Sequence, residues 1–358
     1  MSPLHVILAA GGTGGHIEPA LNVGDALRSM DPQVNVVVVG SERGLEGELV
    51  PARGYRLRTV PAVPLPRRPG ADLVRLAPRL SRSVRAATQI LRDEQADVVV
   101  GFGGYAAVPA YLAARRAHTP IVIHEANARP GIANRLGARF TSHVYAVPAA
   151  HMRGAHDLGI PLRAALTRVD RAAMRAQARA ELGIHGDGPV LLVFGGSQGA
   201  AHLNAVVAQA LPTLLAAGVT VLHAYGSRNE APTAQSGYLP VAYLDRMDLA
   251  YAAADLALTR AGAMTCAELA AVGLPALYVP LPIGNGEQRL NAAPVVEAGG
   301  GIMVADADLT AEWLTETAIP LLHDGPRLQQ MAAAAHRLGV RDASDQLARI
   351  ILQVGGAA

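Results

Sequence analysis

Two glycine-rich turns, about half a chain apart, constrain this sequence most. ILAAGGTGGH occupies residues 7–16 and LVFGGSQGA occupies residues 192–200. Each turn places small residues between an apolar run and an expected helix, an arrangement that lets backbone N–H groups approach phosphate or other polar oxygens. The pair predicts two nucleotide-fold-like halves that face one cleft.

Common explanations for a single glycine-rich turn fit poorly. The dinucleotide fingerprint G-x-G-x-x-G fails because Ile17 stands where the third glycine should fall after Gly12 and Gly14. A P-loop requires a lysine, and all 31 basic residues are arginines. One alternative stays open for each turn, namely glycines that close a tight bend without any ligand.

Composition indicates a globular α/β protein. At 358 residues and 51% apolar content, the chain can form two ordinary domains with well-developed cores. Cys266 is the single cysteine, so no internal disulfide is possible, and the absence of Cys/His clusters fits a reducing cytoplasm without structural zinc. The first ten residues read as a buried strand rather than a signal peptide, so we expect any membrane contact to be peripheral.

Charge is balanced overall and uneven locally. A net charge of +2 argues against a nucleic-acid binder, yet residues 53–92 contain ten arginines and one acid. If residues 76–91 form a helix, an apolar stripe lies beside an arginine face. The stripe consists of Leu76, Leu80, Val84, Ala87 and Leu91, and the arginine face consists of Arg75, Arg79, Arg82 and Arg85. Such a helix either docks on its own domain or attaches to an anionic membrane surface.

Apolar runs alternate with helical patterns in both halves. The runs 6–10, 34–39, 98–100 and 121–123 predict strands in the first half, and 190–194, 219–223, 256–258 and 276–279 predict strands in the second. Helical patterns in the second half cover residues 199–215, 247–253 and 263–272. We therefore predict two doubly wound parallel sheets, in domains 1–160 and 161–340, with a hinge near 157–163. An amphipathic helix over 342–354, within the segment 341–358, could return to the first domain.

Ligands of open parallel sheets gather beyond the carboxyl ends of the strands. In RAGAMTCAE, residues 260–268, the amides near residues 263–265 can meet a diphosphate at a helix N-terminus. Glu268 lies one turn further and can accept from two ribose hydroxyls, or it simply complements the helix dipole. Gln288 and Asn291 share a helical face and can hydrogen-bond sugar hydroxyls.

Six motifs, taken in order, resemble the MurG family of bacterial N-acetylglucosaminyltransferases. They are GGTGGHIEP, GFGGYAAVP, HEANARPGIANR, GGSQGA, RAGAMTCAE and EQRLNA, over roughly residues 4–350. The resemblance implies two Rossmann-like domains of the GT-B class, with UDP-N-acetylglucosamine mainly on the second. It implies a lipid-linked muramoyl-pentapeptide acceptor on the first domain, inverting transfer that forms a β-1,4 bond, and action at the cytoplasmic face of the cell membrane.

The resemblance also implies a set of substrate-binding positions. These are Thr13, Gly14, Gly15, Asn127, Arg163, Ser197, Leu244, Ala263, Met264, Thr265, Cys266, Ala267, Glu268 and Gln288. Leu244 lines the uracil pocket in this scheme and contributes backbone atoms only, because its side chain has no hydrogen-bonding group. The sequence departs from the family pattern at Glu18, Ala126, Ala261, Glu287 and in GIPLR.

His16 is the preferred general base for deprotonating the acceptor's C4 hydroxyl. It follows the glycine turn at a helix N-terminus, whose positive end favours the neutral imidazole. A histidine that only hydrogen-bonds the turn is the alternative, and Glu125 and Glu18 are alternative carboxylate bases. Arg163, Ser197 and helix N-termini can meet the diphosphate charge, so we expect no essential metal or other cofactor.

Other functions stay open. A natural-product glycosyltransferase and a non-hydrolysing UDP-sugar epimerase share this kind of fold, and a non-catalytic nucleotide-sugar-binding module is a third possibility. UDP release that depends on a lipid-linked acceptor separates these functions. The sequence leaves the oligomeric state, the stem peptide of the acceptor and any protein partner open.

Overall fold

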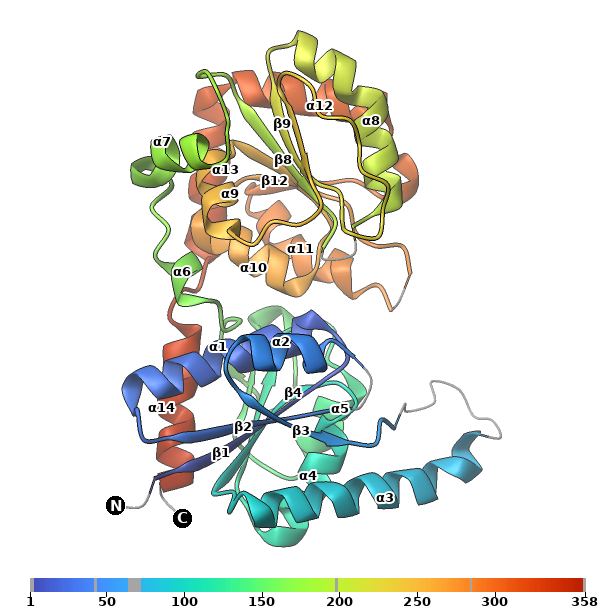
Figure 1. Ribbon diagram of the computed structural model, residues 1–358, viewed down its shortest axis with the longest axis vertical. Helices are drawn as coiled ribbons and strands as arrows, with labels where there is room; N and C mark the ends of the chain where they lie inside the picture. Colours follow the sequence, from blue (N-terminus) through green and yellow to red (C-terminus); the bar gives the residue numbers. More distant parts are fainter. Residues whose placement is uncertain (1–2, 42–43, 64–71, 197–198, 284, 357–358) are drawn as a thin grey trace. The chain divides into compact units, whose positions relative to one another are not determined.

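The computed structural model describes residues 3–41, 44–63, 72–196, 199–283 and 285–356. Its contacts divide the chain into two units (Figure 1). Unit 1 combines Met1–Arg163 with Arg341–Ala358, and unit 2 is Ala164–Val340. The division falls three residues after the position 160 expected from the sequence.

Unit 1 is built on a seven-stranded parallel sheet of order β3-β2-β1-β4-β5-β6-β7. Its strands are β1 (His5–Ala10), β2 (Asn35–Ser41), β3 (Arg56–Val60), β4 (Val98–Gly103), β5 (Ile121–Glu125), β6 (Val144–Ala146) and β7 (His156–Asp157). Its helices are α1 (Gly14–Met30), α2 (Glu46–Ala52), α3 (Asp72–Asp93), α4 (Ala107–Ala117), α5 (Ile132–Gly137), the short 3₁₀ helix η1 (Pro148–Ala150) and α14 (Ala343–Gly356).

Both faces of this sheet are covered, which explains the continuous valine runs of its central strands. Along β1, Val6 and Leu8 face a core shared with α1 and α14, whereas Ile7 and Ala9 face a core shared with α3 and α4. The side-chain period of two thus divides one apolar run between two layers. In α14, Leu347 and Ile351 are fully buried in the first of these cores.

Unit 2 repeats the plan with a six-stranded parallel sheet of order β10-β9-β8-β11-β12-β13. Its strands are β8 (Val190–Phe194), β9 (Thr220–Ala224), β10 (Tyr238–Val241), β11 (Leu256–Thr259), β12 (Ala276–Tyr278) and β13 (Gly301–Met303). Its helices are α6 (Ala164–Thr167), α7 (Arg171–Glu181), α8 (Ala201–Ala216), α9 (Met247–Ala253), α10 (Ala263–Val272), α11 (Glu287–Glu297), the 3₁₀ helix η2 (Asp306–Asp308), α12 (Ala311–His323) and α13 (Gly325–Leu338).

The strand order reverses direction between β1 and β4 in unit 1 and between β8 and β11 in unit 2. At such a reversal the loops that follow the two central strands diverge and leave room for a ligand. The first glycine turn follows β1 and the second follows β8, so each glycine turn lies at the switch point of its own sheet. The predicted class, two doubly wound parallel α/β domains, is confirmed.

Across the described residues, no helix has both the length and the apolar character needed to cross a membrane.

Candidate active site

The first glycine turn is built by close backbone approach. Gly104 has φ +80°, and a Cβ there would lie 2.0 Å from the carbonyl oxygen of Gly11. Gly103 has φ +98°, and a Cβ there would lie 3.0 Å from Cδ2 of His16. The glycines of GFGGY therefore let the loop after β4 pack directly on the turn and on the His16 ring.

His16 lies in the first turn of α1, with Nδ1 3.2 Å from the hydroxyl oxygen of its N-cap residue, Thr13. Burial lowers the pKa of His16, while the charge of Glu125, a hydrogen bond to the backbone of Gly11 and the charge of Glu46 raise it. The net direction favours the neutral imidazole, as the sequence predicts. The largest cause of the shift is desolvation by burial.

Glu125, the second catalytic candidate, ends β5 and is 2% exposed. One oxygen, Oε1, accepts from the backbone N–H of Asn127 at 2.9 Å and from its side-chain amide at 3.2 Å. The other, Oε2, accepts from the Gly131 N–H at 2.9 Å and from Nδ2 of Asn134 at 3.0 Å. These four bonds fill the acceptor sites of a carboxylate, so Glu125 organises the 126–131 loop and offers no lone pair to a substrate proton.

The third candidate base, Glu18, is engaged by two guanidinium groups. Arg163 binds it in a bidentate way, through Nε at 3.1 Å and Nη2 at 2.7 Å, and Arg53 donates from Nη1 at 3.3 Å. This pairing also gives Arg163, a predicted diphosphate ligand, a carboxylate partner within unit 1. A Cβ at Gly14 would meet nothing within 4 Å, and one at Gly15 would lie 3.8 Å from Oγ1 of Thr13, which is ordinary contact.

In unit 2, the second glycine turn also depends on positive backbone angles. Gly196 has φ +95° and Gly199 has φ +73°, and the N–H of Gly199 donates to the carbonyl of Gly196 at 2.9 Å. A Cβ at Gly199 would lie 2.1 Å from the carbonyl oxygen of Tyr225. Ser197, a predicted donor ligand, lies outside the described residues.

The N-terminus of α10 carries most of the predicted donor positions. Gly262 is its N-cap, and the half-buried residues Ala263, Met264 and Thr265 form its first turn, where backbone N–H groups have no partner inside the helix. Ala267, in the next turn, is also half-buried. Cys266 is 5% exposed and packs into the core, and its burial raises the pKa of the thiol. The predicted contact at Cys266 can therefore involve its backbone only.

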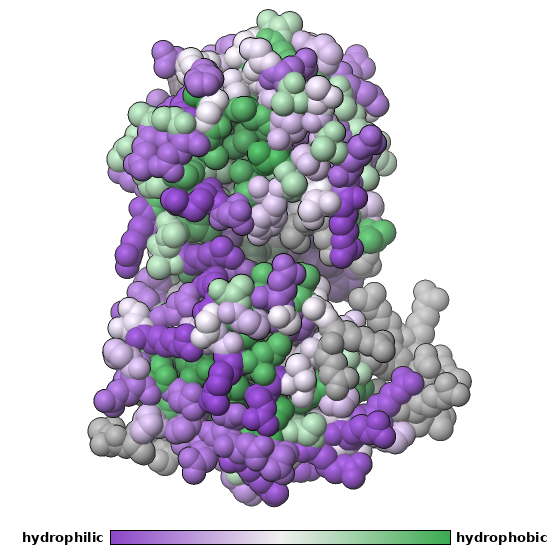
Figure 2. All heavy atoms as spheres, in the orientation of Figure 1, coloured by the Kyte–Doolittle hydropathy of each residue, from purple (hydrophilic) through white to green (hydrophobic). Residues whose placement is uncertain are grey.

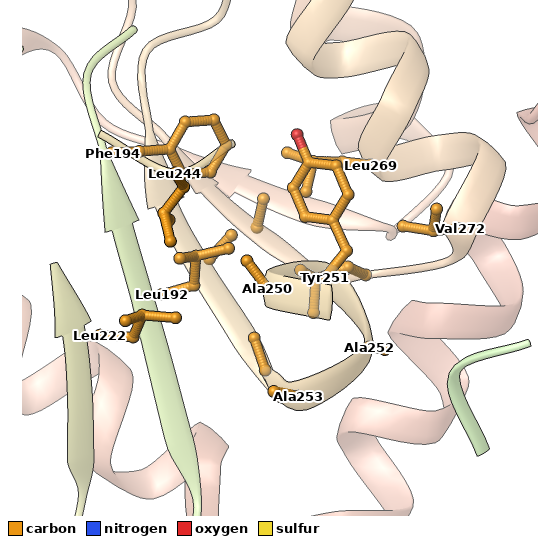
Figure 3. Close-up of a cluster of buried hydrophobic side chains, with 14 of the residues drawn as sticks. Leu192, Phe194, Leu222, Leu244, Ala250, Tyr251, Ala252, Ala253, Leu269 and Val272 are labelled. Atoms are coloured by element: carbon orange, nitrogen blue, oxygen red, sulfur yellow. The ribbon is translucent and has the colours of Figure 1, made fainter. Parts of the chain in front are cut away.

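Glu268 is half-buried on α10 and accepts a hydrogen bond at 2.7 Å from the hydroxyl of Tyr251. Burial and the neighbouring charge of Glu268 raise the pKa of Tyr251 well above its ordinary value, so the hydroxyl stays a donor. The tyrosine comes from α9 (Figure 3), and its hydrogen bond orients the carboxylate. This support was absent from the sequence interpretation.

Leu244 and Gln288 have structural roles next to this helix. Leu244 is 7% exposed and belongs, with Phe194, to the core cluster of Figure 3, so its side chain is unavailable and the predicted uracil contact would use its backbone. The Gln288 oxygen accepts from the N–H groups of Ala261 at 3.1 Å and Leu281 at 2.9 Å. A sugar contact by Gln288 therefore uses its NH₂ group, and its oxygen fixes the loops after β11 and β12.

Two polar residues of unit 1 that the sequence analysis did not single out bond the predicted site residues and the first glycine turn. Asn134 of α5 links Glu125 to Tyr111, whose hydroxyl donates to Asn134 Oδ1 at 2.7 Å. Glu46 of α2 accepts from the Gly12 N–H at 2.8 Å and is fully buried. Asn134 lies in the quoted motif HEANARPGIANR, which is a usable signal, whereas Glu46 stands in a polar stretch that carries none. No group of three or more metal-ligating acids, histidines or cysteines occurs within the described ranges.

Domain families match both halves. The glycosyltransferase family 28 N-terminal domain matches residues 6–146, and the glycosyltransferase family 28 C-terminal domain matches residues 190–347. A curated relative from Streptomyces avermitilis is 56% identical over 356 residues, with 98% of each chain covered. A relative from Mycolicibacterium smegmatis is 55% identical, covering 99% of this chain and 95% of its own. Both are named UDP-N-acetylglucosamine--N-acetylmuramyl-(pentapeptide) pyrophosphoryl-undecaprenol N-acetylglucosamine transferase.

Solved structures agree with this assignment. MurG from Acinetobacter baumannii superposes with a TM-score of 0.78 at 26% identity, over 98% of this chain and all of that one. The Streptomyces glycosyltransferase SsfS6 reaches a TM-score of 0.67 at 17% identity, over 98% of this chain and 99% of its own, which shows a shared fold alone. Two family domains and near-full-length identity above 50% thus place this chain in glycosyltransferase family 28, together with the MurG enzymes.

Proposed function

We propose that this enzyme transfers N-acetylglucosamine from UDP-N-acetylglucosamine to the C4 hydroxyl of a lipid-linked N-acetylmuramoyl-pentapeptide, with inversion at the anomeric carbon. The product is the lipid-linked disaccharide precursor of peptidoglycan. The observation that carries the proposal is 56% identity, over 98% of both chains, to relatives named for this transfer. The polar groups at the two switch points suit its two substrates.

The acceptor belongs to unit 1 in this scheme, with His16 as the base. In the tautomer that carries its proton on Nδ1, the nitrogen next to the Thr13 hydroxyl, Nε2 keeps the lone pair that removes the acceptor's proton. The lowered pKa of His16 keeps the ring neutral near pH 7. Because Glu125 and Glu18 have their oxygens occupied, they support the loops around His16 rather than replace it.

The donor belongs to unit 2. Backbone N–H groups at the start of α10 face the diphosphate, Glu268 accepts from the ribose hydroxyls, and the Gln288 NH₂ group contacts the sugar. Helix N-termini and Arg163 compensate the charge of the leaving UDP, and the proposed reaction uses no essential metal or other cofactor.

We also propose peripheral attachment of unit 1 to the anionic cytoplasmic face of the membrane, where a lipid-linked diphosphate lies at headgroup level. The support is the arginine excess of α3, whose residues Arg79, Arg82 and Arg85 are exposed. The proposal includes no nucleic acid.

Purified protein supplied with UDP-N-acetylglucosamine and a short-chain lipid-linked acceptor tests the proposed transfer. We expect UDP release only when the acceptor is present, with a disaccharide product. His16→Ala should lower kcat by about 10²- to 10⁴-fold while donor binding is retained. Epimerised UDP-sugar formed without acceptor, transfer to a soluble natural product only, or binding without turnover would each replace this function with one of the alternatives.

A further inference from the structure

A buried carboxylate lies beneath the first glycine turn and takes no part in the chemistry described so far. Glu46, the first residue of α2, is 0% exposed. Its Oε1 accepts from the Gly12 N–H at 2.8 Å, from the Ser41 N–H at 3.1 Å and from the Ser41 hydroxyl at 2.9 Å. The end of β2 and the turn after β1 are thus joined through one side-chain oxygen.

Three glycines leave the space that this side chain occupies. A Cβ at Gly11 would lie 2.6 Å from Glu46 Oε1, and one at Gly40 would lie 2.9 Å from its Cγ. A Cβ at Gly44, where φ is +151°, would lie 1.9 Å from Oε2. Glycines from two separate segments therefore accommodate one carboxylate, which indicates that the turn is built around it.

Fold stability alone does not account for a negative charge at this position. Burying a carboxylate is costly unless its lone pairs are satisfied, and Glu46 Oε2 has no hydrogen-bond partner among the residues that the structure describes. A glutamine could accept the same three bonds at Oε1 without that cost. The three bonds at Oε1 therefore do not explain why an acid, rather than an amide, stands at position 46.

The charge of Glu46 acts on the His16 ring, and the charge of Glu125 acts on it more strongly. The titratable groups that act on its ring are Glu125, from β5, and Glu46, from α2, and both charges oppose the lowering of its pKa by burial. Glu125 accepts from three N–H groups of the 126–131 loop and from Asn134 of α5, whereas Glu46 bonds the turn that leads into His16. Glu46 thus has both a mechanical and an electrostatic link to the base.

We propose that Glu46 is a positioning residue for the transfer: it holds the Gly11–Gly12 turn that presents Thr13 and His16, and its negative charge stabilises the imidazolium formed when His16 takes the acceptor's proton. The second part rests on the proposed role of His16. Glu46 itself touches no substrate, and the proton passes from the acceptor hydroxyl to His16 only.

Histidine NMR titration tests the electrostatic link without relying on activity. The His16 signal is assigned by its loss in His16→Gln. Glu46→Gln keeps the shape and removes the charge, so the pKa of His16 should fall by roughly 0.5 unit or more. Ser41→Ala removes a donor and leaves the charge in place, and Glu48→Gln removes one exposed charge from the same helix; both should leave the His16 pKa unchanged. A folded Glu46→Gln protein with a wild-type His16 titration overturns the proposal.

Steady-state kinetics test the positioning link. Glu46→Gln should lower kcat about 10- to 100-fold and move the acid limb of the kcat profile to lower pH, with the donor KM unchanged. Glu48→Gln should match wild type. If Glu46→Gln does not fold, Glu46→Asp keeps the charge and withdraws it from Gly12. Glu46→Asp should then lower kcat about tenfold or more, and wild-type turnover would overturn the proposal.

Failure of the proposed function would look different from failure of this inference. Wild-type protein would then show no acceptor-dependent UDP release, whereas the His16 titration would still report whether Glu46 acts on the ring.

Discussion

Glu125 ends β5 with donors around both of its oxygens. From the sequence motif alone, such a residue could be a general base or an acceptor that stabilises its loop. The sequence does not show how many N–H groups donate to the carboxylate, so it does not separate these two roles. Here Asn127, Gly131 and Asn134 supply them, all within ten residues of the acid. At the scale of one residue, hydrogen-bond count rather than residue type decides the chemistry.

Glu125→Gln separates support from base catalysis. The NH₂ group of the glutamine would face N–H donors and leave them without an acceptor. We therefore expect the free energy of unfolding to fall by about 2–3 kcal/mol and activity to be lost with it. Urea unfolding monitored by circular dichroism measures the stability change, and Glu48→Gln is the charge-matched control. Lost activity in a Glu125→Gln protein of wild-type stability would restore Glu125 as a candidate base.

Glu268→Ala tests the donor site. This substitution removes the proposed acceptor of the ribose hydroxyls and should weaken donor binding by about 1–3 kcal/mol. The donor KM should therefore rise about 10- to 100-fold. Tyr251→Phe should give a smaller rise, because the tyrosine orients the carboxylate without replacing it. Initial rates against donor concentration provide the measurement, with Glu297→Ala, an exposed acid on α11, as control. Normal donor saturation in Glu268→Ala would contradict this site.

Contacts between residues of one short motif were predictable from the sequence, whereas contacts between residues that are far apart in the chain were not. Thr13 and His16 form their contact within one turn, so the glycine motif already suggests it. Glu46 meets Gly12 across 34 positions, and Tyr251 meets Glu268 across 17. Such pairs depend on strand order, which single-sequence patterns do not contain.

At the scale of elements, α3 shows how one amphipathic pattern serves a domain core. Ala87 and Leu91 are buried in the core shared with the sheet and α4, Leu80 packs partly buried against it, and Val84 is buried as well. Over residues 80–91 the apolar stripe therefore packs on its own domain, which is one of the two alternatives open from the sequence. The side chains of Arg75 and Leu76 are not among those that the structure describes. Hydrophilic side chains follow α3 along the edge of unit 1 (Figure 2).

Docking of the stripe leaves the arginine face available for lipid. A variant in which glutamine replaces Arg79, Arg82 and Arg85 should bind anionic vesicles less tightly than wild type, by about 1 kcal/mol per arginine. Binding of the wild-type protein should weaken as the salt concentration rises. Vesicle co-sedimentation is the measurement. The matched control replaces Arg168, Arg327 and Arg337, three exposed arginines of unit 2, and should bind as wild type does. Equal sedimentation of all three proteins at low and high salt would exclude this surface.

Three elements of unit 2 were predictable because each is rich in apolar residues and is bounded by glycine, proline or polar residues. The ranges 190–194, 247–253 and 263–272 are observed with the same bounds as β8, α9 and α10. Short or edge strands were missed: β7 has two residues, β3 alternates with arginines, and β10 contains Pro240. Proline is tolerated in β10 because that strand lies at the edge of its sheet.

At the scale of the whole molecule, unit 1 and unit 2 each contain a buried histidine whose pKa is lowered to about 4. Burial lowers the pKa of His124 in unit 1 to about 4 and that of His223 in unit 2 to about 4. His223 lies between the Tyr238 hydroxyl and the Asn204 side chain, and His124 Nε2 donates to the Gly159 carbonyl. Each unit therefore carries its own acid-sensitive group.

Both units should lose stability as pH falls from 6.5 towards 4. The unfolded chain takes up a proton at the ordinary histidine pKa while the folded chain does not, so protonation favours unfolding by up to about 3 kcal/mol per histidine. Differential scanning calorimetry over this pH range should show falling Tm values.

Variants of the two histidines show which group causes the fall of Tm with pH. His223→Gln should lower Tm at neutral pH and flatten its decline with acid, and His124→Gln should do the same for unit 1. Parallel Tm curves for wild type and both variants would show that other groups cause the acid sensitivity.

The chain enters unit 2 after Arg163 and returns to unit 1 at Arg341, where α14 contributes Leu347 and Ile351 to the first core (Figure 1). This connectivity dictates an order of events on the ribosome. Unit 1 is synthesised first, yet its core stays open until the last helix emerges, whereas unit 2 has every element it needs before α14 is made. The apolar side chains that α14 covers in the first core of unit 1 therefore stay uncovered until residues 343–356 have been synthesised.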